Sequence, residues 1–71
     1  MKIVKEIEDQ QGIALSYDNI GLVFMHQGNN KEALKYFMAY LKINEEIEDT
    51  GSIADAYINI GNVNVKMKNN D

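Results

Sequence analysis

At 71 residues, 45% of them hydrophobic and 25% charged, the chain has room for one small globular domain, and its composition is not that of a disordered protein. The formal net charge of −4 disfavours nucleic acid as a partner, because nucleic-acid binding depends on clustered Lys and Arg. The longest apolar stretch, 20–25, is too short to cross a bilayer, so no membrane partner is expected. Cysteine is absent, which excludes disulfides and thiolate metal sites and fits a cytoplasmic protein.

Four helices are predicted in chain order, at 2–9, 13–27, 31–49 and 53–68. In the second and third of these, apolar residues recur at the i, i+3, i+4, i+7 spacing of a helix with one buried face. No proline interrupts them. The predicted turns are short, so successive helices should pack antiparallel.

Local signals predict where these helices begin and end. Gly28 suits the left-handed conformation that often ends a helix. Asn29 with Glu32, and Ser52 with Asp55, have the spacing of a capping box, in which two side chains satisfy the free N–H groups of a first turn. New helices are therefore expected to start directly after Asn29 and Ser52.

The sequence repeats itself at an offset of 40 residues. Residues 1–31 and 41–71 are identical at 15 of 31 aligned positions, without a gap, which is far above chance. Gly21 and Gly61 are one identical pair, and both lie inside predicted helices. Since glycine inside a helix costs about 1 kcal/mol relative to alanine, the pair predicts a close helix crossing at each place. The alternative is that both glycines were carried along by duplication.

The repeating pattern resembles the tetratricopeptide repeat, in its longer variety of about 40 residues. The family's helix A carries an aromatic, then Leu-Gly, then a second aromatic, and its helix B carries a small residue with an aromatic four positions later. The similar residues are Tyr17, Ile20, Gly21 and Phe24 for helix A, Ala33 and Phe37 for helix B, and Tyr57, Ile60 and Gly61 for the next helix A. The resemblance implies an all-α fold of antiparallel helix-turn-helix repeats, a fragment of an α-solenoid.

In this frame the chain is a single tetratricopeptide-like domain, 1–71. Residues 1–9 correspond to the end of a helix B, 12–50 to one full repeat, and 52–70 to helix A of a second repeat. Repeats of this kind bury their apolar faces against neighbours. The helix at 53–68 should therefore have an uncovered side, either because the chain is part of a longer array or because copies associate.

Two positions depart from the family pattern. Tyr40 stands where a small residue is usual late in helix B, so it should crowd the following helix or turn outward. Asn64 stands where the second aromatic of helix A should recur. The aromatics at core spacing are expected to pack between helices rather than to stack on a ligand: Tyr17, Phe24, Phe37 and Tyr57.

The resemblance implies that a protein or peptide binds on a concave face lined by helix A residues. These residues are Leu15, Asp18, Asn19, Leu22 and His26 in the first helix A, and Asp55, Ile58, Asn59, Asn62 and Lys66 in the next. Asn19 and Asn59 stand out, because an amide offers the donor and the acceptor that a peptide backbone needs. The alternative is that they are exposed or bonded to a neighbouring helix. Binding of a C-terminal carboxylate is not expected, since Asp18 and Leu22 replace that subtype's lysine and asparagine.

No catalytic, cofactor-binding or metal-binding residues are predicted, so the chain is not expected to be an enzyme. His26 is the only histidine, and Val23 stands where a Glu-x-x-His motif would have its glutamate, which favours a surface histidine. An acidic cluster lacks the ligand loop of a calcium site and is read as a solvated helix end. Its members are Glu45, Glu46, Glu48 and Asp49.

Two functions follow as alternatives. The first is a scaffold or sensory module that binds a protein or peptide on the concave face. The second is an assembly element that forms a homo-oligomer and completes its repeat array with another copy, including by helix exchange.

Overall fold

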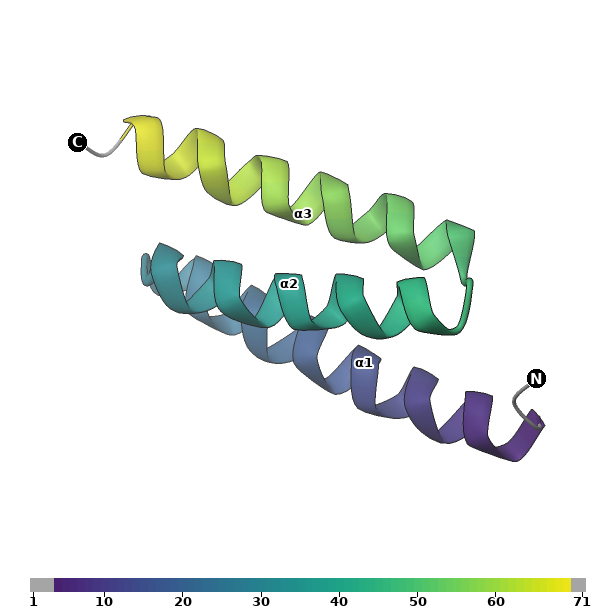
Figure 1. Ribbon diagram of the computed structural model, residues 1–71. Coiled ribbons are helices and arrows are strands. Elements are labelled where there is room, and N and C mark those ends of the chain that lie inside the picture. Colours follow the sequence, from purple (N-terminus) through teal and green to yellow (C-terminus); the bar gives the residue numbers. More distant parts are fainter. Residues whose placement is uncertain (1–3, 70–71) are drawn as a thin grey trace.

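The computed structural model describes residues 4–69 as three α-helices joined by two short turns (Figure 1). The helices are α1 (Val4–His26), α2 (Asn30–Glu46) and α3 (Thr50–Asn69). Helix α2 lies between the other two and runs antiparallel to both, so α1 and α3 run in the same direction (Figure 1). The prediction of an all-α fold with antiparallel neighbours is confirmed. The ends of the predicted segments at 1–3 and at 70 lie outside the described residues.

The first turn forms as the sequence predicts. Gly28 adopts a φ of 81°, in the left-handed region. The Gly28 N–H donates to the Met25 carbonyl at 3.1 Å and the Asn29 N–H donates to the Phe24 carbonyl at 2.9 Å. This pair of bonds is the Schellman ending of a helix, which satisfies carbonyls left free in the last turn. Asn29 occupies the N-cap of α2, but its side chain makes no capping hydrogen bond, so the predicted capping box is wrong.

The second turn follows the same scheme with a different residue. The N–H of Glu48 donates to the Glu45 carbonyl at 3.2 Å and that of Asp49 donates to the Asn44 carbonyl at 3.0 Å. Glu48 has the position in this turn that Gly28 has in the first. It adopts the left-handed conformation with a φ of 59°, which residues with a side chain rarely do. Helix α2 therefore ends at Glu46, earlier than the predicted 49.

Helix α3 begins at Thr50 because Asp49 caps it. One Asp49 carboxylate oxygen accepts from the Ser52 backbone N–H at 3.2 Å, and the other accepts from the Ser52 hydroxyl at 2.9 Å. The predicted pairing of Ser52 with Asp55 is wrong, since Ser52 pairs backwards with Asp49.

The predicted break between 2–9 and 13–27 is also wrong, because α1 is continuous through 10–12. Asp9 matches Asp49 in the repeat, but Gly12 stands where Ser52 provides the capping partner. The intervening residues are two glutamines in place of Thr50 and Gly51, and glutamine is the better helix former. Residues 4–9 are thus the first turns of α1 and not a separate helix.

The core consists of two small clusters along α2. One joins Ala14 of α1, Tyr40 of α2 and Ala56 of α3, and the other joins Ala33, Phe37 and Val63. Tyr40 neither crowds α3 nor turns outward as predicted, since it is buried between the two alanines. Small residues on both outer helices thus make room for the aromatic ring on the middle one.

The two repeated glycines differ in their surroundings. A Cβ atom at Gly21 would lie 2.7 Å from the Phe37 ring, so α1 crosses α2 closely there, as predicted. A Cβ at Gly61 would meet nothing within 4 Å, and the same prediction is wrong for that position. Phe37 is fully buried, while Tyr17 and Phe24 are partly buried against the Tyr36 ring, at centroid distances of 5.9 and 5.6 Å.

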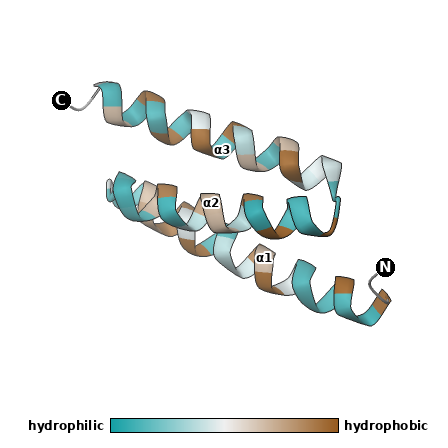
Figure 2. Ribbon diagram, viewed as in Figure 1, coloured by the Kyte–Doolittle hydropathy of each residue, from teal (hydrophilic) through white to brown (hydrophobic). Residues whose placement is uncertain are grey.

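Tyr57 does not take the core position expected of it, since its side chain is 57% exposed. Apolar residues recur along the whole of α3, not only where it faces α2 (Figure 2).

Candidate protein-binding surface

The ten residues predicted for the concave face lie on α1 and α3, five on each helix. Most are exposed in the structure: Leu15, Asn19, His26, Asp55, Ile58, Asn62 and Lys66. Asp18, Leu22 and Asn59 are partly buried. Leu22 packs against the cluster around Phe37, so it belongs partly to the core. The two rows come from parallel helices on either side of α2 (Figure 1).

One hydrogen bond joins the two rows. The Asn59 side-chain amide donates to the Asp18 carboxylate at 2.8 Å, which links α1 to α3 directly. Burial raises the pKa of the Asp18 carboxyl above its ordinary value; the hydrogen bond from Asn59 opposes this rise, and the nearby Asp55 charge adds to it. The surface here is acidic and partly desolvated, a setting that favours a hydrogen-bond donor over a carboxylate.

The two repeated asparagines are therefore not equivalent. Asn59 uses an amide N–H within the protein and has one N–H and its oxygen left for a ligand. Asn19 is exposed on α1. The sequence left open the alternative that these asparagines bond to a neighbouring helix. Asn59 makes such a bond, to Asp18 of α1.

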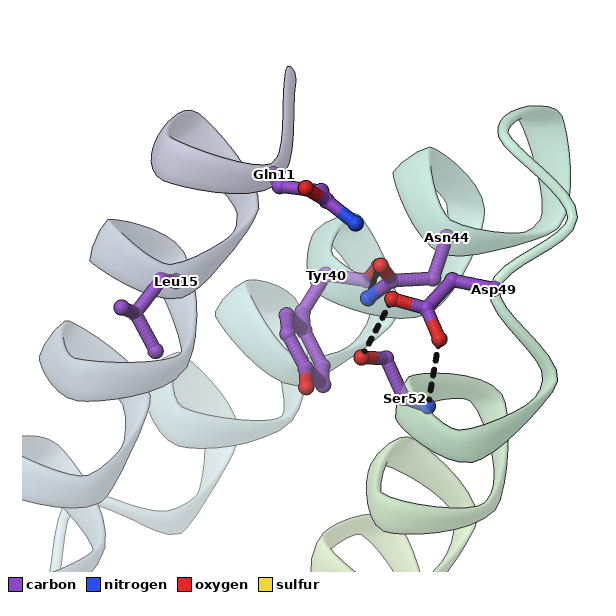
Figure 3. Close-up of a pocket in the computed structure, with 6 residues that line it drawn as sticks. All are labelled: Gln11, Leu15, Tyr40, Asn44, Asp49 and Ser52. Carbon is purple, nitrogen blue, oxygen red and sulfur yellow. Dashed lines mark hydrogen bonds between the residues drawn. The ribbon is translucent and has the colours of Figure 1, made fainter. Parts of the chain in front are cut away.

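A hollow of about 200 Å³ opens beside Leu15 where the three helices meet (Figure 3). Gln11 and Leu15 of α1 form one side, and Asp49 and Ser52 form the other (Figure 3). Tyr40 and Asn44 of α2 lie between them.

Two polar residues of this hollow are held by hydrogen bonds of their own. Asn44 is buried, and its amide donates to the Tyr40 carbonyl at 2.9 Å. Hydrogen bonds, first from the Ser52 backbone and then from its hydroxyl, lower the pKa of the Asp49 carboxyl. The carboxylate therefore stays ionised at the edge of the hollow.

Of these lining residues, only Leu15 was predicted from the sequence to contact a partner. The available signals were an asparagine inside a helix, four positions after Tyr40, and the Asp49-x-x-Ser52 spacing of a helix start. Both signals are local. The hollow itself depends on how α1 and α3 approach the end of α2.

The described residues were also searched for a metal site and for membrane-spanning helices. Among residues 4–69 no group of three His, Cys, Asp or Glu side chains is placed to hold a metal ion. His26 is exposed at the end of α1, as predicted. None of the three described helices is long and apolar enough to cross a membrane.

Comparison with known proteins identifies the repeat. A family model described as "Tetratricopeptide repeat" matches residues 14–47, which comprise the second half of α1, the Gly28 turn and α2. No curated protein and no solved structure matches the chain. Repeats of this family are protein–protein interaction modules and not catalytic folds. The segment matched here holds the Gly21–Phe37 crossing and five of the surface residues described above. Residues 14–47 of this chain are therefore a tetratricopeptide repeat.

Proposed function

We propose that the chain binds an extended peptide segment of a protein partner on the face shared by α1 and α3. The observation that carries the proposal is the Asp18–Asn59 hydrogen bond, which links the two rows of predicted contact residues. Exposed polar groups there can pair with a peptide backbone, and the exposed side chain of Leu15 offers apolar contact beside the hollow.

The charges on this face suggest what kind of peptide it takes. Asp18 and Asp55 lie near the Asn59 bond, and Asp49 borders the hollow. Acidic side chains or a terminal carboxylate of a peptide would be repelled there, since like charges in a partly desolvated site are unfavourable. The segment is therefore neutral or basic where it passes Asp18.

We make three further proposals, about catalysis, nucleic-acid binding and cellular location. The chain does not catalyse a reaction, since its repeat belongs to an interaction family. It does not bind nucleic acid, given its net charge of −4. We place it in the cytoplasm on the strength of a sequence without cysteine.

A test uses peptides selected from a random display library on the immobilised chain. Asn19→Ala and Leu15→Ala remove exposed side chains and should leave the fold intact, yet each should weaken a selected peptide about tenfold if that side chain is an anchor. Lys35→Ala, on the exposed side of α2, is the matched control and should bind normally. Equal affinity of all three variants would rule out this face.

Self-association is the second candidate function. It is favoured by apolar side chains exposed on both outer helices, among them Val23 on α1 and Val65 on α3. Copies could stack by these surfaces and continue the array, or exchange helices. Sedimentation equilibrium should then show a concentration-dependent dimer or larger species that Val23→Ser weakens. A monomer at the highest attainable concentration would exclude this candidate.

A further inference from the structure

The turn between α2 and α3 has a sequence that is helical elsewhere in the same chain. Residues 6–9 and 46–49 are both Glu-Ile-Glu-Asp. The first copy lies inside the continuous helix α1, whereas in the second copy α2 ends at Glu46 and residues 47–49 form the turn. These four residues therefore do not specify a turn by themselves, and they are compatible with an unbroken helix.

The residues of this turn hold it only weakly. Glu48 has the left-handed conformation, with a φ of 59°, which is unfavourable for a residue with a side chain. The hydrogen bonds from Ser52 to the Asp49 carboxylate cap α3 and contribute a stabilisation of similar size. Because these two effects nearly offset each other, the turn persists mainly through the packing of α3 on α2.

The turn between α1 and α2 is different because Gly28 occupies its left-handed position. Glycine adopts a φ of 81° without the steric cost that other residues bear. Glycine is also a poor residue for continuing a helix through the turn. Only the second turn therefore has, at this position, a residue that prefers the right-handed helix.

We infer that residues 47–49 are a hinge that straightens, so that α2 and α3 join into one helix and two copies of the chain exchange α3. The joined helix, 30–69, would be roughly 60 Å long, and its α3 part could not fold back on its own α2. The α2 surface that α3 covers would then receive α3 of the second copy. This inference rests on the self-association candidate, since exchange requires a second copy, and it gives that candidate a mechanism.

Exchange would preserve the contacts of α3, because each is remade between the two copies. Phe37 of α2 and Val63 of α3 are fully buried in one cluster, and this cluster would form from two chains. The Asn59–Asp18 hydrogen bond would join α3 of one copy to α1 of the other. The balance between the two forms then depends on the hinge and on the protein concentration, as is usual when identical elements are exchanged.

The three residues after the hinge decide whether it bends. Thr-Gly-Ser follows it at 50–52, whereas Gln-Gln-Gly follows the helical copy, at 10–12. Ser52 supplies the groups that bond to Asp49, and glutamine is a better helix former than threonine or glycine. A Cβ atom at Gly51 would make only an ordinary contact, 3.8 Å from Asp49 Oδ1. Placing the residues of 10–12 at 50–52 should therefore straighten the hinge.

The test uses a hinge variant with the three substitutions Thr50→Gln, Gly51→Gln and Ser52→Gly. The native chain has no cysteine, so Lys35→Cys and Lys68→Cys allow two spin labels, one on α2 and one on α3. Labelled chains are mixed with an excess of the same chain without labels, so that the measured distance lies within one chain.

The two forms differ widely in this distance. In the folded-back form the start of α2 lies beside the end of α3 (Figure 1), so the labelled positions are within about 20 Å of each other. In the joined helix they would be about 50 Å apart. The hinge variant should show the long distance and sediment as a dimer. In the native chain the long distance should appear in a fraction that rises with concentration.

Two control variants should keep the short distance. Thr50→Gln alone is the matched control, because it retains the hydrogen bonds between Ser52 and Asp49. Glu48→Gly makes the second turn like the first, with glycine in the left-handed position, so it should remove the long distance at every concentration.

The inference is overturned if the hinge variant keeps the short distance. It is also overturned if this variant loses helix content by circular dichroism, since the joined helix is at least as helical as the native fold. Native dimers that show only the short distance overturn the hinge and leave self-association by the exposed faces standing. A native chain that stays monomeric at the highest attainable concentration overturns both.

Discussion

The Asn59 side chain donates a 2.8 Å hydrogen bond to the Asp18 carboxylate, joining two helices that α2 otherwise separates. Asp18 and Asn59 are 41 residues apart and come from successive copies of the repeated unit. The bond is therefore made between neighbouring units, and it lies on the face where we propose that a peptide binds. The burial of Asp18, which raises the pKa of its carboxyl, also gives that face a pH dependence.

Asp18→Asn should make the chain more stable at neutral pH. Burial raises the pKa of Asp18 in the folded state, so the folded protein favours the protonated carboxyl, and stability is lost as pH rises through this raised pKa. The asparagine variant keeps an oxygen that accepts from Asn59 but carries no charge to desolvate. Melting temperatures of both forms, measured from pH 3 to pH 8, should differ most at the upper end and converge in acid. A gap that widens in acid would contradict this assignment.

Asp49→Ala should cost about 1 kcal/mol, because it removes the N-cap of α3. Asp9→Ala is the matched control, since Asp9 has the same place in the repeat but lies inside the continuous α1. Urea unfolding should show little change for it.

The pH dependence of the Asp49 cap has the opposite sign to that of Asp18. The pKa of Asp49 is lowered in the folded state, so its contribution is present above the ordinary value and is lost as pH falls through the lowered pKa. The difference between the native chain and Asp49→Ala should shrink in acid. Equal losses for the variants at positions 9 and 49 would show that the cap does not stabilise α3.

The fold was predictable where its signals are local. Helix periodicity predicted α2 and most of α1 and α3, and Gly28 predicted the first turn, because backbone preferences act within a few residues. The continuity of α1 was missed because residues 6–9 are identical to residues 46–49. The three residues that follow, 10–12 in one copy and 50–52 in the other, decide whether the chain continues as a helix or forms a capped turn.

Burial was predicted less well than helix formation. Tyr57 and Gly61 have the same places in the repeat as Tyr17 and Gly21, yet only the α1 pair is covered by a neighbouring helix. Periodicity identifies the face that can be buried, but burial requires a second helix against it. A bond from Asn59 to a neighbouring helix was left open as an alternative, but its partner Asp18 was not predicted, since it depends on how α1 and α3 approach each other.

Gly21→Ala and Gly61→Ala should have opposite effects on the free energy of unfolding. At Gly21 the methyl group would press on the buried Phe37 ring, and overpacking of this kind costs about 1–3 kcal/mol. At Gly61 there is open space, so the variant should gain up to about 1 kcal/mol from helix propensity. Chemical denaturation of both variants tests this, and two changes of the same sign would contradict the described crossing.

Val63→Ala and Val23→Ala form a similar pair. Val63 is fully buried in the cluster around Phe37, whereas Val23, its counterpart in the repeat, is 55% exposed. We expect a loss of about 2 kcal/mol for Val63→Ala from lost burial and the cavity left behind. The loss for Val23→Ala should stay within about 0.5 kcal/mol. Thermal unfolding followed by calorimetry measures both, and a larger loss at position 23 would mean that α1 is covered on that side.

The most direct test of the proposed function is an amide chemical-shift map of the chain, recorded while a library-selected peptide is added. If a peptide binds on the proposed face, the largest shifts should lie on both outer helices, around Leu15 and Asn19 of α1 and around Asn59 and Asn62 of α3. Shifts gathered instead around Lys35 and Met38, on the exposed side of α2, would contradict it.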